Sequence, residues 1–131
     1  MTGPADPSRD RRLLVVEDNP FNQRIVGLML TRLGYRHDFA ASGEEALTAA
    51  ASAYDLVLMD LQLPGIDGAE ATRQIRHGDG PNRDIPIVGL TATAAEAEVQ
   101  SCLDSGMNTV LAKPIKAEKL ADTLAHFLPP A

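Results

Sequence analysis

The chain alternates short apolar runs with longer segments in which apolar residues recur at helical spacing. Residues 13–16 and 56–59 are continuously apolar, a pattern typical of strands buried on both faces of a parallel sheet. Less marked segments predict three further strands, at residues 36–40, 85–91 and 109–112. The pattern therefore predicts five strands, each followed by a helix.

Capping residues mark the first two helices. Pro20 suits the first turn of a helix that Gly34 closes. The apolar face of that helix consists of Phe21, Ile25, Leu28 and Met29. Ser42, with Glu45 three positions later, forms a capping-box pattern that opens an alanine-rich helix to about residue 53.

Three more helices complete the alternation. Turn residues at 64–68 introduce a helix through Ile75, and a fourth helix is predicted at about residues 94–105 with Gly106 as its cap. The last helix has an apolar face of Leu120, Leu124, Phe127 and Leu128. Five strands alternating with five helices favour an open, doubly wound parallel sheet of the α/β class, with right-handed crossovers that place helices on both faces.

Composition narrows the class of protein. The chain is 44% hydrophobic and 23% charged, as in ordinary globular domains, and has no internal repeat. We expect one domain over residues 12–131, with residues 1–11, which lack apolar periodicity, as a tail or linker remnant. The net charge of −6 opposes attraction to nucleic-acid phosphates, so no nucleic-acid partner is expected.

Cysteine content and hydropathy indicate the compartment. The single Cys102 cannot form an intrachain disulfide. No apolar run approaches the roughly 18 residues that a membrane span needs, and the first residues lack the apolar core of a secretory signal. We therefore expect a cytoplasmic domain that makes no membrane contact itself.

Polar side chains follow four of the predicted strands at the point where each strand ends. They are Glu17, Asp18, Asp60, Thr91 and Lys113. In an open parallel sheet, the functional crevice lies outside the carboxyl ends of the strands. We therefore expect these five side chains to converge in one pocket.

The acidic members of this set suggest a metal site. Three carboxylates held together repel one another unless a cation is present, and hard oxygen ligands suit Mg²⁺ or Mn²⁺. Asp18 and Asp60 are the expected direct ligands, whereas Glu17 is expected to act through water. The backbone carbonyl of Gln62 is the candidate for a further ligand.

An aspartate beside a metal and a lysine is a plausible nucleophile toward phosphorus. The metal and the Lys113 ammonium would both neutralise charge that builds on the transferring oxygens during attack by Asp60. Thr91 could donate its hydroxyl to the same phosphoryl group and pull the following loop inward. The residues thus predict a phosphoacceptor with a built-in switch.

Four fragments of the chain, in order, resemble the receiver domains of response regulators. They are residues 15–23 (VVEDNPFNQ), 59–68 (MDLQLPGIDG), 90–92 (LTA) and 113–115 (KPI). The resemblance covers residues 12–128. It implies a CheY-like, flavodoxin-like (βα)5 fold: a three-layer sandwich around a five-stranded parallel sheet in the order 2-1-3-4-5.

The resemblance also implies a role for each site residue. Asp60 would accept a phosphoryl group from a phosphohistidine, with Glu17 and Asp18 as the acidic pair at the metal. Thr91 would be the switch hydroxyl and Lys113 the phosphate-binding lysine, joined to Pro114 by a cis peptide bond. Self-phosphorylation and autodephosphorylation are expected, but no independent turnover enzyme.

Residues 17–23 are more similar to receivers of hybrid sensor histidine kinases and phosphorelays than to those preceding a DNA-binding output domain. The implied partners are a histidine kinase, a histidine phosphotransfer domain docking beside the first helix, or both. A stand-alone single-domain regulator remains an alternative, and a monomer is expected.

Many relatives carry an aromatic residue or histidine where this chain has Val110. That departure suits a domain that passes the phosphoryl group on.

Three rival functions fit the sequence less well. A phosphatase with Asp60 as nucleophile would need a second carboxylate two residues later, where Gln62 stands. A flavin module would need Gly, Ser and Thr where the first strand ends in two acidic residues. A degenerate receiver working only as an interaction module is disfavoured because all five site residues are present. The three histidines lack metal-ligand spacing and are expected at the surface or rim.

Overall fold

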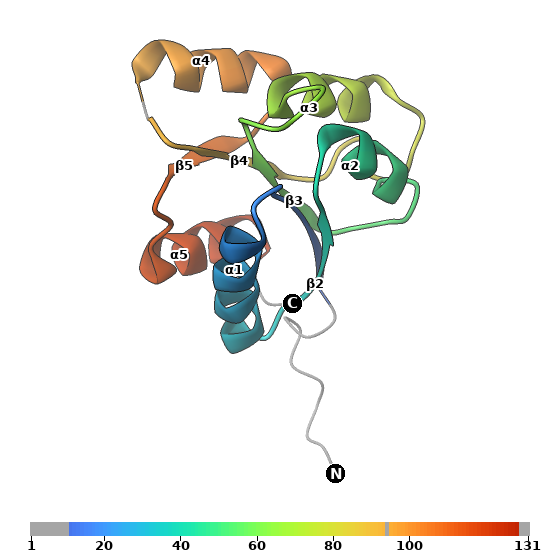
Figure 1. Cartoon of the computed structure of the whole chain (residues 1–131). Helices are drawn as coiled ribbons and strands as arrows, with labels where there is room; N and C mark the ends of the chain where they lie inside the picture. Colours follow the sequence, from blue (N-terminus) through green and yellow to red (C-terminus); the bar gives the residue numbers. More distant parts are fainter. Residues whose placement is uncertain (1–10, 94, 129–131) are drawn as a thin grey trace.

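The computed structural model describes residues 11–93 and 95–128, and within these ranges five strands alternate with five helices (Figure 1). The strands are β1 (Arg12–Val16), β2 (Arg36–Ala40), β3 (Leu56–Asp60), β4 (Ile87–Thr91) and β5 (Thr109–Ala112). The helices are α1 (Pro20–Leu33), α2 (Gly43–Ala49), α3 (Gly68–His77), α4 (Glu96–Ser105) and α5 (Ala117–Phe127). The predicted tail falls almost wholly on residues 1–10, which lie outside the described residues.

All neighbouring strands are parallel, and their order is β2-β1-β3-β4-β5. Figure 1 shows α1 and α5 on one face of the sheet and α2, α3 and α4 on the other. The predicted three-layer fold and strand order are therefore confirmed. The order reverses between β1 and β3, which places the carboxyl ends of these two strands side by side at the switch point.

Two hydrophobic clusters, one on each face of the sheet, explain the continuously apolar strands. In β3, Leu56 and Leu58 belong to one cluster, and Val57 and Met59 belong to the other. All four are fully buried, which contributes on the order of 1.5–3 kcal/mol for each large side chain. No residue of the strand is exposed, and Asp60 at its end is buried as well.

Several boundaries differ from the sequence prediction. β4 begins at Ile87 rather than at residue 85, because Pro86 lacks the N–H that a strand residue donates. The Pro86 carbonyl still accepts from the Val57 N–H at 3.0 Å. The fourth helix begins at Glu96, whereas the predicted start at residue 94 lies outside the described residues.

The second helix ends at Ala49 rather than near residue 53. The buried Asn82 holds the chain that follows, donating to the carbonyls of Ala50 and Ser52 at 2.8 Å each. Its side-chain oxygen accepts from the Tyr54 N–H at 2.7 Å. A side chain about 30 residues away therefore satisfies the backbone that local sequence assigned to a helix.

Candidate functional site

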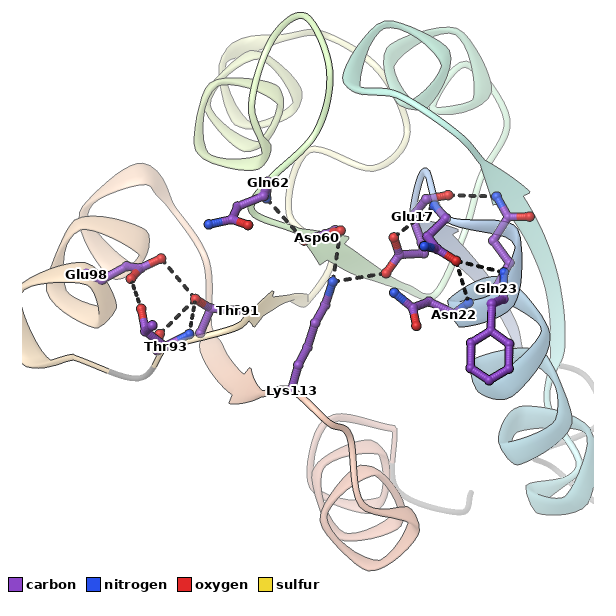
Figure 2. Close-up of polar contacts among 11 residues, drawn as sticks. Glu17, Asn22, Gln23, Asp60, Gln62, Thr91, Thr93, Glu98 and Lys113 are labelled. Atoms are coloured by element: carbon purple, nitrogen blue, oxygen red, sulfur yellow. Dashed lines mark hydrogen bonds and ion pairs between the residues drawn. The ribbon is translucent and has the colours of Figure 1, made fainter.

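The site lies at the carboxyl ends of β1, β3 and β5. Glu17 directly follows β1, Asp60 is the last residue of β3, and Lys113 directly follows β5. Figure 2 shows the Lys113 side chain reaching across the sheet edge to both carboxylates. Glu17 and Asp60 are only 1% and 3% exposed, so their charges lie in a poorly hydrated environment.

Lys113 joins the two buried carboxylates. Its Nζ lies 3.0 Å from Asp60 Oδ2 and 3.1 Å from Glu17 Oε1. Burial acts to lower the pKa of Lys113, but hydrogen bonds to Asp60 and Glu17 and their negative charges outweigh burial, so the pKa is raised. The ammonium is therefore held in its charged form between the two carboxylates.

Asp18 completes an acidic cluster with the two buried residues. One carboxylate oxygen each from Glu17, Asp18 and Asp60 lies within 4.8 Å of the others. Asp18 is exposed, so the cluster opens to solvent on its side. These are hard oxygen donors close enough together to share one small cation.

Backbone and amide donors fix the orientation of the carboxylates. The Gln62 N–H donates to Asp60 Oδ1 at 3.1 Å, and the Asn19 N–H donates to Glu17 Oε2 at 3.1 Å. Gln23 Nε2 donates to the Glu17 carbonyl oxygen at 2.6 Å. Asn19 also caps α1, because its Oδ1 accepts from the two backbone N–H groups that follow Pro20.

Two features that shape the site, Gln23 and Gly68, were missed by reasoning from sequence. Gln23 lies six residues after Glu17, and its amide reaches back from α1 to the loop that carries the acidic pair. Gly68 opens α3, where a Cβ atom would lie 2.2 Å from the Asp60 carbonyl oxygen. Only a residue without a Cβ allows this approach, although nothing in the local sequence separates that need from an ordinary turn glycine.

Thr91 lies apart from the acidic cluster. It ends β4 and is 1% exposed, yet its hydroxyl lies 2.9 Å from Glu98 Oε1 and 2.7 Å from the Thr93 carbonyl oxygen. Figure 2 shows these contacts on the side of Thr91 away from Asp60. The structure thus brings together the acidic residues and the lysine but leaves the predicted switch hydroxyl with α4. Glu98 was not anticipated from sequence.

Other predicted features have mixed outcomes. The expected cis peptide bond between Lys113 and Pro114 is present. Val110 is half-buried in β5 and pairs with Gly89. Of the three histidines, His77 and His126 are exposed as predicted. His37 is half-buried, as a rim position allows, and its buried Nδ1 has no hydrogen-bond partner among the described residues.

The strand order and the acidic residues and lysine at the carboxyl ends of the strands together define a class of protein. The family comparison identifies that class. The family model described as the response regulator receiver domain matches residues 13–125. This chain therefore belongs to the response regulator receiver domain family.

Individual relatives agree with this assignment. The chain is 40% identical over 124 residues to the sensor histidine kinase RcsC of Salmonella typhi, an alignment that covers 94% of this chain but 13% of RcsC. The chain thus spans about an eighth of that relative. The resemblance to receiver domains of sensor histidine kinases is confirmed. Within the described ranges, no helix combines the length and apolar character needed to cross a bilayer.

Two solved structures are informative. The receiver domain of sensor histidine kinase PA1611 from Pseudomonas aeruginosa, determined with a magnesium ion in its active-site cleft, is 43% identical, with a TM-score of 0.83 and coverage of 90% of this chain and 97% of that one. The receiver domain of Ssk1 from Saccharomyces cerevisiae, in complex with the histidine phosphotransfer protein Ypd1, is 30% identical, with a TM-score of 0.82 and coverage of 95% and 92%.

Proposed function

We propose that this chain accepts a phosphoryl group on Asp60 in a Mg²⁺-dependent reaction within a phosphorelay. The observation that carries the proposal is the buried Asp60 carboxylate, placed 3.0 Å from the Lys113 ammonium and beside two further carboxylates. An anionic nucleophile, a fixed cation and a set of hard oxygen ligands are the parts that phosphoryl transfer requires.

The donor set fits a divalent cation. Three carboxylates supply more negative charge than Lys113 alone can neutralise, and two of them are buried. Asp18 and Asp60 would hold Mg²⁺ or Mn²⁺ directly, with Glu17 acting through water and the Gln62 backbone carbonyl as a further ligand. When bound, the cation would neutralise charge on the phosphoryl oxygens. The related PA1611 receiver was determined with magnesium in its cleft.

The proposed reaction begins with attack by one Asp60 carboxylate oxygen on the phosphorus of a phosphohistidine. A P–O bond to Asp60 forms, the P–N bond to the imidazole breaks, and the imidazole leaves with the electron pair of that bond and takes up a proton. Lys113 holds the carboxylate in place before attack and then pairs with a phosphoryl oxygen. Thr91 would donate its hydroxyl to another phosphoryl oxygen.

The phosphodonor surface is proposed to lie along α1. Phe21 and Leu28 are 68% and 58% exposed, and with Ile25 they have the spacing of one helical face. Exposed large apolar side chains in a row favour a protein partner. A histidine phosphotransfer domain suits this surface, as supported by the complex of the related Ssk1 receiver with Ypd1. A receiver within a hybrid histidine kinase is the favoured origin, and a stand-alone regulator is the alternative.

Phosphorylation with a small donor tests the central claim. The wild type incubated with acetyl phosphate and Mg²⁺ should gain the mass of one phosphoryl group, and Asp60→Asn should not. Asp79→Asn is the matched control, because Asp79 is an exposed loop carboxylate. It should be phosphorylated like the wild type. A mass gain that persists in Asp60→Asn, or a wild type that is never modified, would overturn the proposal.

A further inference from the structure

The Thr91 hydroxyl is already engaged, and its partners lie on the far side from Asp60. It is within donating distance of Glu98 Oε1, at 2.9 Å, and of the Thr93 carbonyl oxygen, at 2.7 Å. It also accepts from the Thr93 N–H at 3.2 Å. Among the described residues, none of its hydrogen bonds goes to Asp60 or Lys113 (Figure 2). Thr91 itself is 1% exposed, whereas Thr93 is exposed and Glu98 is half-buried.

Glu98 clamps two threonines with one carboxylate. Oε1 contacts the Thr91 hydroxyl, and Oε2 accepts a hydrogen bond from the Thr93 hydroxyl. Glu98 stands in the first turn of α4, where the helix dipole favours a negative charge. The hydrogen bond from Thr93, then that from Thr91, lowers the pKa of Glu98. The carboxylate is therefore ionised at neutral pH and is a strong acceptor.

A threonine hydroxyl has one hydrogen to donate. Its acceptors in the structure are Glu98 and the Thr93 carbonyl oxygen, and donation to either excludes donation to a phosphoryl oxygen on Asp60. We propose that Glu98 is a positioning residue that withholds the Thr91 hydroxyl from the phosphoryl site, so that α4 and a phosphoryl group compete for Thr91. This inference rests on the proposed function, because it concerns how the phosphorylated form of the same site is reached.

The competition has a reciprocal consequence. The factor by which the contact between Glu98 and Thr91 weakens phosphoryl binding must equal the factor by which a bound phosphoryl group weakens that contact. Occupation of the phosphoryl site would release Glu98 and thereby free the first turn of α4. The inferred signal is thus a change at α4 that needs no aromatic side chain at Val110.

Beryllium trifluoride with Mg²⁺ is a suitable probe, because it binds to an aspartate as a phosphoryl mimic without a covalent transfer. The chain contains no tryptophan, so binding is followed by ¹⁹F NMR. Glu98→Ala should bind the probe about three- to tenfold more tightly than the wild type, the range expected for one partly exposed hydrogen bond. Glu98→Gln keeps an oxygen acceptor and should fall between the two.

Matched variants separate positioning from a general effect of charge. Glu96→Ala removes the same charge from the same helical turn and should bind the probe like the wild type. Thr91→Ala should bind more weakly, and adding Glu98→Ala to it should give no further change. The Mg²⁺ dissociation constant measured without the probe should be equal in the wild type and Glu98→Ala, because neither Thr91 nor Glu98 belongs to the acidic cluster.

The outcomes distinguish this inference from the proposed function. If the wild type binds the probe and Glu98→Ala binds it no more tightly, the inference is wrong while the phosphoacceptor role stands. A gain that survives in the Thr91→Ala background, or that Glu96→Ala reproduces, also overturns it. If the wild type fails to bind the probe, or if Asp60→Asn binds it as tightly as the wild type, the proposed function itself fails and the inference with it.

Discussion

Replacing Lys113 with methionine removes the cation that lies between two buried carboxylates while keeping a side chain of similar length. Glu17 and Asp60 then remain side by side with no counter-ion, because the Lys113 contacts at 3.0 and 3.1 Å are lost. Breaking a fully buried ion pair costs about 3–5 kcal/mol. The lysine side chain is 24% exposed, so solvent screening reduces the expected loss of unfolding free energy to about 2–3 kcal/mol.

Urea unfolding at neutral pH, with a chelator present to exclude divalent cations, measures this loss. Lys119→Met is the control, because Lys119 is exposed on α5 and its replacement changes the net charge equally. The folded-state pKa of Lys113 is raised, so its stabilisation is fully present below its ordinary value of 10.5 and is lost as the pH rises through the folded-state value. The gap between Lys113→Met and the wild type should therefore be constant near neutrality and shrink only in strong alkali.

Divalent cations should partly restore Lys113→Met. A bound cation stabilises the folded chain by mass action, and removal of a neighbouring positive charge should strengthen its binding. The midpoint of urea unfolding should therefore rise more with Mg²⁺ in Lys113→Met than in the wild type. If the variant and the wild type unfold at the same urea concentration in the chelator, the lysine contacts contribute little and this account of the site is wrong.

Two further variants probe the partner surface and the site backbone. Phe21→Ala should slow phosphotransfer from a phosphorylated histidine phosphotransfer domain about tenfold while leaving acetyl phosphate labelling of Asp60 unchanged. Leu103→Ala, which truncates an exposed leucine on α4, should slow neither reaction, and equal slowing in both variants would refute docking on α1. Gly68→Ala should lower the unfolding free energy by about 1–3 kcal/mol, since its Cβ would meet the backbone of β3. Gly80→Ala, whose Cβ would lie 3.6 Å from the nearest atom, is the control, and equal thermal midpoints for the two variants would contradict the close approach.

The strands and the acidic cluster were predictable because each is marked by a pattern of a few consecutive residues. A continuously apolar run such as residues 56–59 needs burial on both faces, and Asp60 at its end must then lie at the sheet edge. The resemblance of the surrounding motifs supplied the strand order. Glu17 and Lys113 meet although 96 residues separate them. The parallel topology places the ends of all the strands at one edge of the sheet, and the long Lys113 side chain reaches across that edge from β5 toward β1.

Features that depend on one particular distant side chain could not be predicted in this way. The second helix ends early because Asn82 donates hydrogen bonds to the carbonyls that follow it. Neither the sequence around Asn82 nor that of the helix end indicates that the two segments meet. The Thr91 hydroxyl contacts Glu98, seven residues away on a helix whose start the sequence marked poorly. Ala95 at its N-cap makes no side-chain cap hydrogen bond, so the usual capping signal is missing.

Because Lys113 directly follows the last strand, the site is complete only when nearly the whole chain has been synthesised. Ribosomes make the acidic residues after β1 and β3 well before they make β5, which occupies an edge of the sheet. A chain that ends before β5 contains the carboxylates but not the ammonium that pairs with them. Chains that are truncated before β5, or in which β5 has not joined the sheet, would therefore be poor phosphoacceptors. Phosphorylation of Asp60 would then indicate that the whole sheet has formed.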